Sequence, residues 1–275
     1  MVLRKWSWRV VCRAVPFALV VPLVVLLDVR RAVPERSAAP VRTTPSPSAP
    51  PAPAPSPSPS PTPTDHATQT AAHRFKGMPV VGVLIPAGGD LSEHFCTAAV
   101  VDSPGGNLVV TAAHCLGGRS DLEFAPGYHD GEAPYGIWRV GRTFTDDAWD
   151  ASADPNHDVV FLQMESRKGR RLQDVTGAGR LDTGRRSHEV VRVVGYPVDD
   201  DRPVSCWTRT EKRSAHQMEF HCDGFPAGTS GGPFIAQDGA IIGIIGGYER
   251  GGDTPDVSYS VIFGGAVRTL YDQSL

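Results

Sequence analysis

The stretch Ala227-Gly228-Thr229-Ser230-Gly231-Gly232-Pro233 surrounds one serine with residues that turn tightly, directly before the apolar pair Phe234-Ile235. Glycine adopts backbone conformations that other residues avoid, so this stretch can expose a hydroxyl beside unpaired backbone N–H groups. Acyl-transfer chemistry requires that combination of a nucleophile and donors for an oxyanion. Taken alone, the stretch is equally typical of a turn between two strands.

Short apolar runs separated by turn residues lie on both sides of this stretch. They are found at 78–85, 97–101, 108–111, 159–162, 189–194, 241–245 and 259–262. Short runs of this kind, joined by Gly and Asp turns, favour an all-β sandwich or a pair of barrels. Only residues 265–272 have a helical pattern. Residues 74–275 are therefore predicted to form one all-β domain with a short C-terminal helix.

The first 33 residues are typical of an export signal. Four basic residues precede the apolar run 14–27, which is shorter than a usual bilayer span. The following Asp28-Val29-Arg30-Arg31 offers no clear cleavage site, so two interpretations stay open. Residues 1–33 are either a signal peptide that is removed or a signal anchor that attaches the chain to a membrane through residues 10–27. Both predict a secreted or extracellular protein.

Residues 34–73 are rich in Pro, Ala, Ser and Thr, with an alternating Pro-Ser pattern at 55–61. Such a segment has few side chains to bury and many fixed φ angles, which predicts a disordered linker that acts as a stalk. The whole chain has a formal net charge of -3 and no basic stripe. These features argue against nucleic acid as a partner.

Four cysteines lie in the predicted domain: Cys96, Cys115, Cys206 and Cys222. An even number in an exported chain indicates disulfides, and four cysteines allow three pairings. We favour Cys96 with Cys115 and Cys206 with Cys222, because each pair closes a short loop. The neighbouring pairs His114-Cys115 and His221-Cys222 raise zinc binding as an alternative, but the spacing of a zinc motif is missing, and no metal site is predicted.

A base, an orienting acid and a nucleophile occur in this order along the chain. His114 ends the apolar run 108–113, Asp158 precedes the run 159–162, and Ser230 lies in the glycine-rich stretch. Singly, each has a simpler interpretation as a buried histidine, a turn aspartate or a turn serine. Together, each beside a predicted strand, they predict a His-Asp-Ser triad.

With these motifs in place, the chain resembles the trypsin/chymotrypsin-type serine peptidases, in particular their compact secreted bacterial members. The resemblance covers about residues 75–267 and rests on His94-Phe95-Cys96-Thr97, Thr111-Ala112-Ala113-His114-Cys115, His157-Asp158-Val159-Val160, Gly228-Thr229-Ser230-Gly231-Gly232-Pro233 and Ile242-Gly243-Ile244-Ile245-Gly246. It implies two six-stranded antiparallel β-barrels of the chymotrypsin-like type, with His114 and Asp158 from the first and Ser230 from the second.

The resemblance also implies an activity. Ser230 would attack a peptide bond and form an acyl-enzyme, and the backbone N–H groups of Gly228 and Ser230 would hold the oxyanion. The expected protein is an exported serine endopeptidase that acts on polypeptides as a monomer, without a metal or an organic cofactor. The alternative is a catalytically silent trypsin-fold module for binding or adhesion, displayed on the stalk. An α/β-hydrolase esterase is disfavoured because its serine precedes its acid and histidine in the chain.

Two features depart from the animal digestive members. Thr229 stands where those enzymes have an aspartate that pairs with a new amino terminus, and no Ile-Val-Gly-Gly motif precedes Met78. The substrate pocket also differs: Asp223 could select Arg or Lys but is one residue out of register, and 245–247 offers no basic group for a glutamate. The substrate-binding residues expected from the resemblance are Asp223, Gly224, Phe225, Gly246, Gly247 and Tyr248.

Overall fold

The computed structural model describes residues 68–119, 121–185 and 187–275. The predicted signal segment, 1–33, and the linker up to residue 67 lie outside the described residues. None of the helices in the described part of the chain is long and apolar enough to cross a membrane. The two interpretations of the N-terminal apolar run therefore stay predictions.

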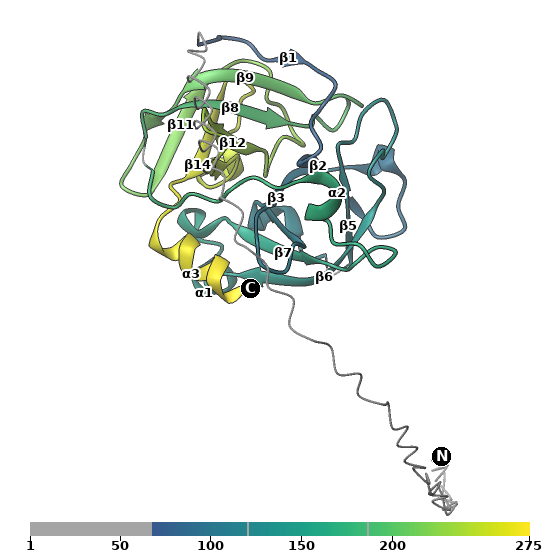
Figure 1. Ribbon diagram of the computed structural model, residues 1–275. Coiled ribbons are helices and arrows are strands. Elements are labelled where there is room, and N and C mark those ends of the chain that lie inside the picture. The colour runs from purple at the N-terminus through teal and green to yellow at the C-terminus, as the bar shows by residue number, and fades with distance from the viewer. Residues whose placement is uncertain (1–67, 120, 186) are drawn as a thin grey trace, which may run out of the picture. The chain divides into compact units, whose positions relative to one another are not determined.

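Six antiparallel strands close into a barrel in the first half of the domain, in the order β2-β3-β4-β7-β6-β5 (Figure 1). The strands are β2 Val81–Pro86, β3 Cys96–Val101, β4 Leu108–Thr111, β5 Leu122–Pro126, β6 Trp138–Thr145 and β7 Val160–Met164. This confirms the first predicted barrel. The sequence did not predict β5 and β6. In β6, the exposed Arg139 lies between the buried residues Trp138 and Val140, and the exposed Arg142 follows them. The strand therefore contains no continuous apolar run.

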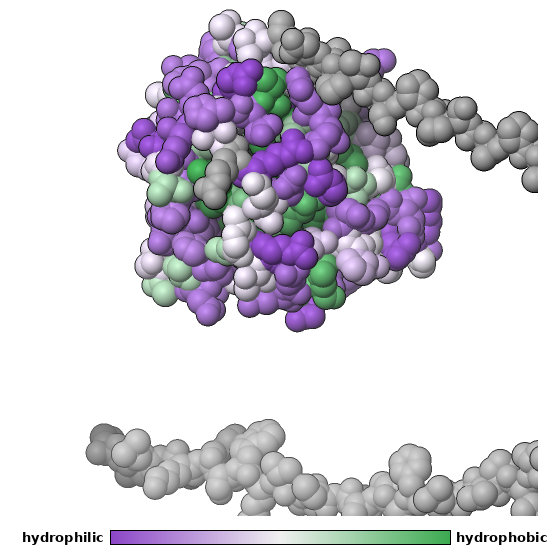
Figure 2. All heavy atoms as spheres, turned by 60° about the vertical axis from the view of Figure 1, so that its left-hand side comes forward, coloured by the Kyte–Doolittle hydropathy of each residue, from purple (hydrophilic) through white to green (hydrophobic). Residues whose placement is uncertain are grey.

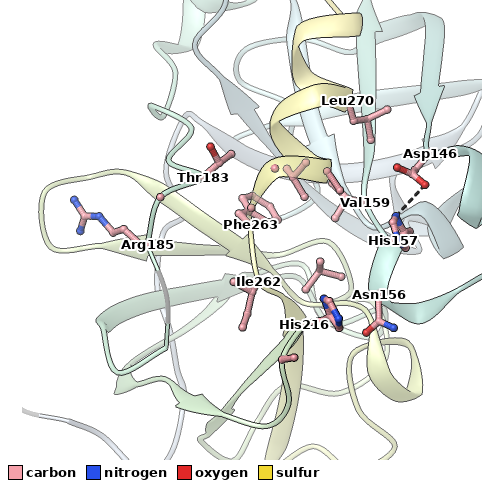
Figure 3. A pocket seen from close by; sticks show the side chains of 17 residues that line it. Asp146, Asn156, His157, Val159, Thr183, Arg185, His216, Ile262, Phe263 and Leu270 are labelled. Atoms are coloured by element: carbon pink, nitrogen blue, oxygen red, sulfur yellow. Dashed lines mark ion pairs between the residues drawn. The ribbon is translucent and has the colours of Figure 1, made fainter.

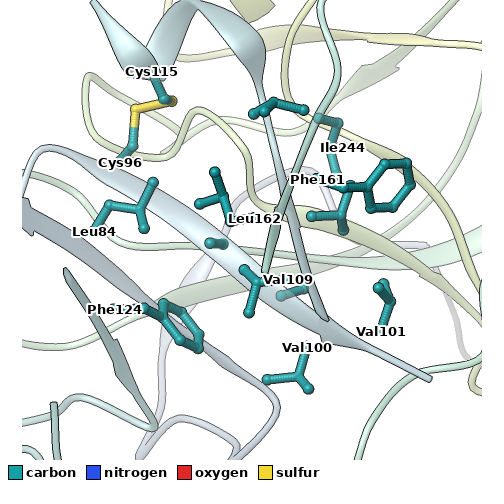
Figure 4. Packing of buried hydrophobic residues seen from close by; sticks show 14 of the residues in the cluster. Leu84, Cys96, Val100, Val101, Val109, Cys115, Phe124, Phe161, Leu162 and Ile244 are labelled. Carbon is teal, nitrogen blue, oxygen red and sulfur yellow. A yellow bond between two sulfur atoms is a disulfide. The ribbon is translucent and has the colours of Figure 1, made fainter. Parts of the chain in front are cut away.

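Fully buried side chains fill this barrel, as Figure 4 shows for Leu84, Phe124, Val109 and Leu162. Val109 of β4 lies opposite Leu162 of β7 in the strand register. Every residue of β3 and β4 is buried, so both faces of these strands are covered by other parts of the protein. The end of β4 and the start of β7 are thus held rigidly.

The second half contains a five-stranded sheet, β1-β9-β8-β12-β13, and a three-stranded sheet, β10-β11-β14. The strands are β1 His73–Arg74, β8 Val190–Gly195, β9 Val204–Arg209, β10 Glu211–Lys212, β11 Gln217–His221, β12 Pro233–Ala236, β13 Ile241–Ile244 and β14 Val257–Val261. The expected second closed barrel is therefore an open pair of sheets in the described residues.

Where these two sheets meet, side chains supply hydrogen bonds and a disulfide in place of the regular backbone hydrogen bonds between neighbouring strands. The Ile244 N–H donates to Ser260 Oγ at 3.0 Å. At the other edge, the Cys206–Cys222 disulfide joins β9 to the residue that follows β11, and Thr208 Oγ1 donates to the His221 carbonyl at 3.3 Å. The arrangement still encloses a second apolar core around Phe220 and Phe234, so the predicted all-β architecture with a core in each half is confirmed.

Residues 69–73, which the sequence assigns to the linker, are paired with the second half. His73 lies opposite Ser205 of β9, and Ala71 forms a parallel bridge with Asp223. The ordered domain thus begins before residue 74. Composition did not indicate this, because backbone groups make these bonds and almost any side chain is compatible with them.

One of the described helices packs against strands β6 and β7 of the first barrel. The helix predicted at 265–272 is confirmed as α3 Gly265–Gln273, which buries Val267 and Leu270 against the core. The other helices are α1 Asp147–Ser152 and α2 Gln173–Thr176, and the short 3-10 turns are η1 Leu91–Glu93, η2 Ala113–Leu116, η3 Pro155–His157 and η4 Tyr248–Gly251. The face turned forward in Figure 2 is mostly hydrophilic, with apolar side chains in small separate areas.

Candidate active site

His114 lies in η2, immediately after β4, at the point where the first barrel meets the second half. The Cys96–Cys115 disulfide ties this turn to the start of β3, which confirms one predicted pairing, and the second pairing is confirmed as well. Ala112 and Ala113 are buried, because small side chains let the turn pack closely. The imidazole remains 12% exposed, so the ring is accessible from the cleft.

Asp158 is fully buried and accepts three hydrogen bonds. The His114 Nδ1–H donates to Oδ2 at 2.7 Å, and the His114 backbone N–H donates to Oδ1 at 2.8 Å. The Gly247 N–H donates to Oδ2 at 2.8 Å. A buried carboxylate is costly unless such partners satisfy it. The three donors also fix its direction, so Asp158 holds the imidazole with Nε2 free to face the cleft.

Glycine at position 246 allows the two halves to approach closely around this carboxylate. A Cβ there would lie 3.2 Å from Asp158 Oδ2 and 3.2 Å from the Ala112 side chain. The Gly246 N–H donates to the Tyr259 carbonyl, which attaches the segment to β14. The segment 245–247 therefore connects the second half to the acid of the first half.

The backbone around Ser230 is held by two segments that also lie beside the His114–Asp158 pair. These segments are the start of β3 and residues 245–247. The Thr97 N–H, next to Cys96, donates to the Ser230 carbonyl at 2.7 Å, and the Gly231 N–H donates to the Ile245 carbonyl at 2.7 Å. Gly231 has a φ of 80°, and a Cβ there would lie 2.0 Å from Thr111 Oγ1. The structure thus brings Ser230 to the junction where His114 and Asp158 lie.

Two adjoining pockets lie at this junction, and we call them together the cleft. His114 and Asp158 line a pocket of about 780 Å³, and Ser230 lines a pocket of about 210 Å³. Arg250 is common to the linings of both pockets.

The two expected oxyanion donors have peptide groups of fixed orientation. The Ala227 carbonyl accepts a bond from the Val198 N–H at 3.0 Å, and the Thr229 carbonyl accepts one from the Gly232 N–H at 2.9 Å. In a trans peptide the carbonyl and the following N–H point in opposite directions. The N–H groups of Gly228 and Ser230 therefore point away from these partners, and neither donates to any residue in the described part of the chain.

Thr97 organises the loop that carries Ser230, although from the sequence alone it is only a member of a motif. It is fully buried. Its Oγ1 donates to the Gly228 carbonyl at 2.9 Å and accepts a bond from the Tyr196 N–H at 2.8 Å. Together with the bond to Ser230, these contacts hold both sides of the loop. The only sequence feature that could have indicated this role is the position of Thr97 directly after Cys96, which forms a disulfide.

The expected substrate-binding residues do not all lie in the cleft. Phe225 lines the Ser230 pocket, and Gly247 lines the His114 pocket. Gly246 is buried beneath Asp158. Tyr248 is 36% exposed at the rim, where its ring packs edge-on against Tyr259.

Two of the expected substrate-binding residues, Asp223 and Gly224, lie outside the pocket that contains Ser230. Asp223 is exposed and pairs through its backbone with residues 70 and 72. Gly224 faces Ala72, and neither residue lines the pocket that contains Ser230. The sequence missed Arg250, Asp253 and Thr254, which line that pocket instead. The pair Gly251-Gly252, with φ of 100° and 129°, was a usable signal that the chain turns there.

A pocket of about 500 Å³ lies beside His157, directly before Asp158 in the chain (Figure 3). Its floor is apolar, with Ile262, Phe263 and Leu270, and neither His114 nor Ser230 lines it. His157 Nδ1 lies 2.9 Å from Asp146 Oδ1, the residue that caps α1. This pair supports η3, the turn that leads into Asp158, and the pocket is not part of the cleft.

Two groups of described side chains bring potential metal ligands close together. In one, His114 lies beside Cys96 and Cys115, whose sulfur atoms are used in the disulfide. The other, on β10 and β11, consists of Glu211, Glu219 and His221 and is not part of the cleft.

Comparisons with known proteins agree with the fold. The family model described as a trypsin-like peptidase domain matches residues 96–244. The crystal structure of the protease Anisep from Arthrobacter nicotinovorans has a TM-score of 0.66 and 21% identity, covering 74% of this chain and 99% of that one. A thermostable serine protease, AL20, from an extremophilic microorganism has a TM-score of 0.63 and 25% identity, covering 71% and 96%.

A third structure, a Glu endopeptidase in complex with MPD, has a TM-score of 0.62 and 15% identity, covering 76% of this chain and 99% of that one. The search of curated protein sequences gave no match. The family match spans all three residues of the expected triad.

Proposed function

The chain belongs to the trypsin-like peptidase family, and from that premise we propose that it is an exported serine endopeptidase that works through His114, Asp158 and Ser230. The observation that carries the proposal is the buried Asp158, which accepts hydrogen bonds from both the Nδ1–H and the backbone N–H of His114. A histidine held in this way is oriented to act as a general base.

In the proposed reaction, Ser230 Oγ attacks the carbonyl carbon of the peptide bond while His114 Nε2 takes its proton. Asp158 keeps the Nδ1–H tautomer in place and stabilises the imidazolium. The proton then passes from His114 to the leaving amine, and an acyl-enzyme remains on Ser230. Water, deprotonated by His114, hydrolyses that ester and restores the free serine.

The negative charge that develops on the carbonyl oxygen would be met by the N–H groups of Gly228 and Ser230. Their orientation supports this role, because the carbonyls of the same peptides are tied to Val198 and Gly232. Each such donor contributes about 3 kcal/mol to stabilising the transition state. Preorganisation means that this stabilisation needs no rearrangement during the reaction.

We assign the side chain on the acyl side of the cleaved bond to the pocket of about 210 Å³ beside Ser230. Buried Phe225 and Ile245 form its apolar part and Thr229 and Thr254 its uncharged polar part, which favours a small or medium-sized uncharged residue. Arg250 and Asp253 carry opposite charges at the same pocket, so neither acidic nor basic side chains gain a net preference. Because Asp223 lies elsewhere, the expected basis for selecting Arg or Lys is absent from the described pocket lining.

Export is supported by the two disulfides, since such bonds persist in oxidising compartments. We propose that the domain acts outside the cytoplasm as a monomer. It is either free after removal of residues 1–33 or held at a membrane through residues 10–27. Residues 34–67 would serve as the stalk in the second case.

The proposal is tested by incubating the full chain and Ser230→Ala with a library of internally quenched peptides and mapping the cut sites by mass spectrometry. We expect internal cleavage by the wild type and a loss of roughly a thousandfold or more in the variant. Peptide binding without cleavage by either protein would instead favour the silent binding or adhesion module. Cleavage that persists in Ser230→Ala would refute the assigned nucleophile.

A further inference from the structure

Residues 69–74, which we call the strap, lie between β9 and the loop that leads to Ser230 (Figure 1). On one side the Gln69 N–H donates to the Trp207 carbonyl at 2.6 Å, and the Trp207 N–H donates to Gln69 Oε1 at 2.9 Å. His73 and Arg74 continue the pairing along β9. The strap is thus an added edge strand, although its sequence belongs to the end of the linker.

On its other side the strap holds the start of the serine loop, residues 223–230. The Ala72 N–H donates to the Asp223 carbonyl at 2.7 Å, and the Asp223 N–H donates to the Thr70 carbonyl at 2.9 Å. Gly224, with a φ of 106°, lies so close that a Cβ there would be 3.2 Å from the Ala72 side chain. Phe225, the next residue, already lines the Ser230 pocket.

The strap also reaches the opposite end of the same loop. The Arg74 side chain forms an ion pair with Asp200, in the turn closed by the bond from the Asp200 N–H to the Pro197 carbonyl. Val198 in this turn donates to the Ala227 carbonyl, and that bond directs the Gly228 N–H. The ion pair therefore acts on the oxyanion donor through one short turn.

A loop of this composition needs contacts from outside to keep one conformation. Gly224 and Gly228 both have positive φ values, and glycine has the largest conformational freedom to lose on ordering. Among the contacts that hold residues 223–230, those at Asp223 and those through Asp200 come from the strap. No other segment in the described part of the chain contacts both of these places through a hydrogen bond or an ion pair.

We propose that the strap is a positioning element for the serine loop, with Thr70, Ala72 and Arg74 as positioning residues, so that the junction between linker and domain controls turnover. This inference rests on the proposed peptidase function. It means that the stalk ends inside the catalytic domain. Cutting the chain before residue 69 would leave the strap in place, whereas separating residues 69–74 from the domain would lower activity.

The test reverses the charge of one exposed residue in the full chain. Arg74→Glu places a carboxylate against Asp200 without touching the core, since the Arg74 side chain is 67% exposed. Arg268→Glu is the matched control, because Arg268 forms a similarly exposed pair with Asp272 in α3 and not with Asp200. The double variant Arg74→Glu/Asp200→Arg restores the attraction with reversed charges.

We expect Arg74→Glu to lower kcat about fivefold, with KM changed by less than about twofold, because the Arg74–Asp200 pair acts through Val198 on the Gly228 N–H, which binds the oxyanion of the transition state. Arg268→Glu should stay within about twofold of the wild type, and the double variant should recover most of the loss. Ala72→Pro, which removes the N–H donor to Asp223, should lower kcat further than Arg74→Glu, and Ala72→Ser, which keeps that donor, should not.

Amide hydrogen exchange gives a readout that does not depend on activity. Exchange within residues 223–230 should be faster in Arg74→Glu than in the wild type, while the first barrel stays unchanged. A wild type that cleaves peptides, together with an Arg74→Glu variant of equal kcat and equal exchange, would overturn the role of the strap alone. A wild type without any cleavage would overturn the peptidase function, and the exchange rates would still decide whether the strap orders the loop.

Discussion

Thr97→Val removes one oxygen atom from the centre of the serine loop and keeps the shape of the side chain. Thr97 is fully buried. The substitution breaks the bond from Oγ1 to the Gly228 carbonyl and the bond from the Tyr196 N–H to Oγ1. The backbone bond to Ser230 remains, because every residue except proline supplies that N–H. The change therefore isolates the contribution of the hydroxyl.

The expected loss follows from the two backbone groups that stay buried without a partner. Leaving a buried polar group unsatisfied costs about 1–3 kcal/mol, so the free energy of unfolding should fall by about 2–6 kcal/mol for the two groups. For a domain of this size each kcal/mol corresponds to roughly 2–4 °C in Tm, which gives a decrease of about 4–24 °C. A partly misdirected oxyanion donor should lower kcat by about tenfold, below the loss expected for a missing donor.

The assay combines thermal unfolding with steady-state kinetics on one peptide substrate. Thr208→Val is the control, since Thr208 is also buried but makes a single 3.3 Å bond to the His221 carbonyl, outside the serine loop. We expect that control to lose less stability and to keep its kcat. If Thr97→Val keeps the wild-type kcat, or loses no more stability than Thr208→Val, the reasoning about the loop is wrong.

Three further predictions concern the stability or the activity of variants that each remove one interaction. Cys206→Ala/Cys222→Ala opens a short loop and should lower the unfolding free energy by about 3 kcal/mol in denaturant titrations. Thr229→Ala removes a bond inside the 226–229 turn but should stay active, so a folded variant without turnover would contradict us. A hydrogen bond from the Gly184 N–H and neighbouring arginines lower the pKa of Asp182. The ionised Asp182 therefore stabilises the folded protein at pH values above the usual carboxyl pKa, and this contribution is lost as the pH falls through its lowered pKa. In Asp182→Asn the free energy of unfolding should therefore decrease less steeply on acidification.

The sequence predicted the parts of the fold that depend on buried apolar runs. The run 108–111 matches β4 Leu108–Thr111, because every side chain of this strand is buried. The order of His114, Asp158 and Ser230 was also readable, since each lies beside a strand. Trp138–Thr145 was missed, because its exposed arginines hide the alternation.

The remaining features depend on contacts between backbone groups or between distant segments. The strap at 69–74 is held mostly by main-chain bonds, and its two side-chain contacts, from Gln69 and Arg74, reach Trp207 and Asp200 far along the sequence, so composition carries no signal for it. Thr97 gains its role from the Gly228 carbonyl, far along the sequence. Asp223 was assigned to the substrate pocket by its distance in sequence from Ser230, but the loop turns at Gly224 and leaves it outside. Sequence distance alone does not indicate such a turn.

The central claim is that an imidazole, a buried carboxylate and two directed amides activate one serine. A fluorophosphonate probe tests it most directly, because the probe reacts with an activated serine and the modified residue can be located by peptide mapping. We predict one label, on Ser230, formed by the wild type and reduced at least a hundredfold by His114→Ala, roughly the loss of one strong general base. An unlabelled Ser230 in the folded wild type, or equally fast labelling of His114→Ala, would contradict the account.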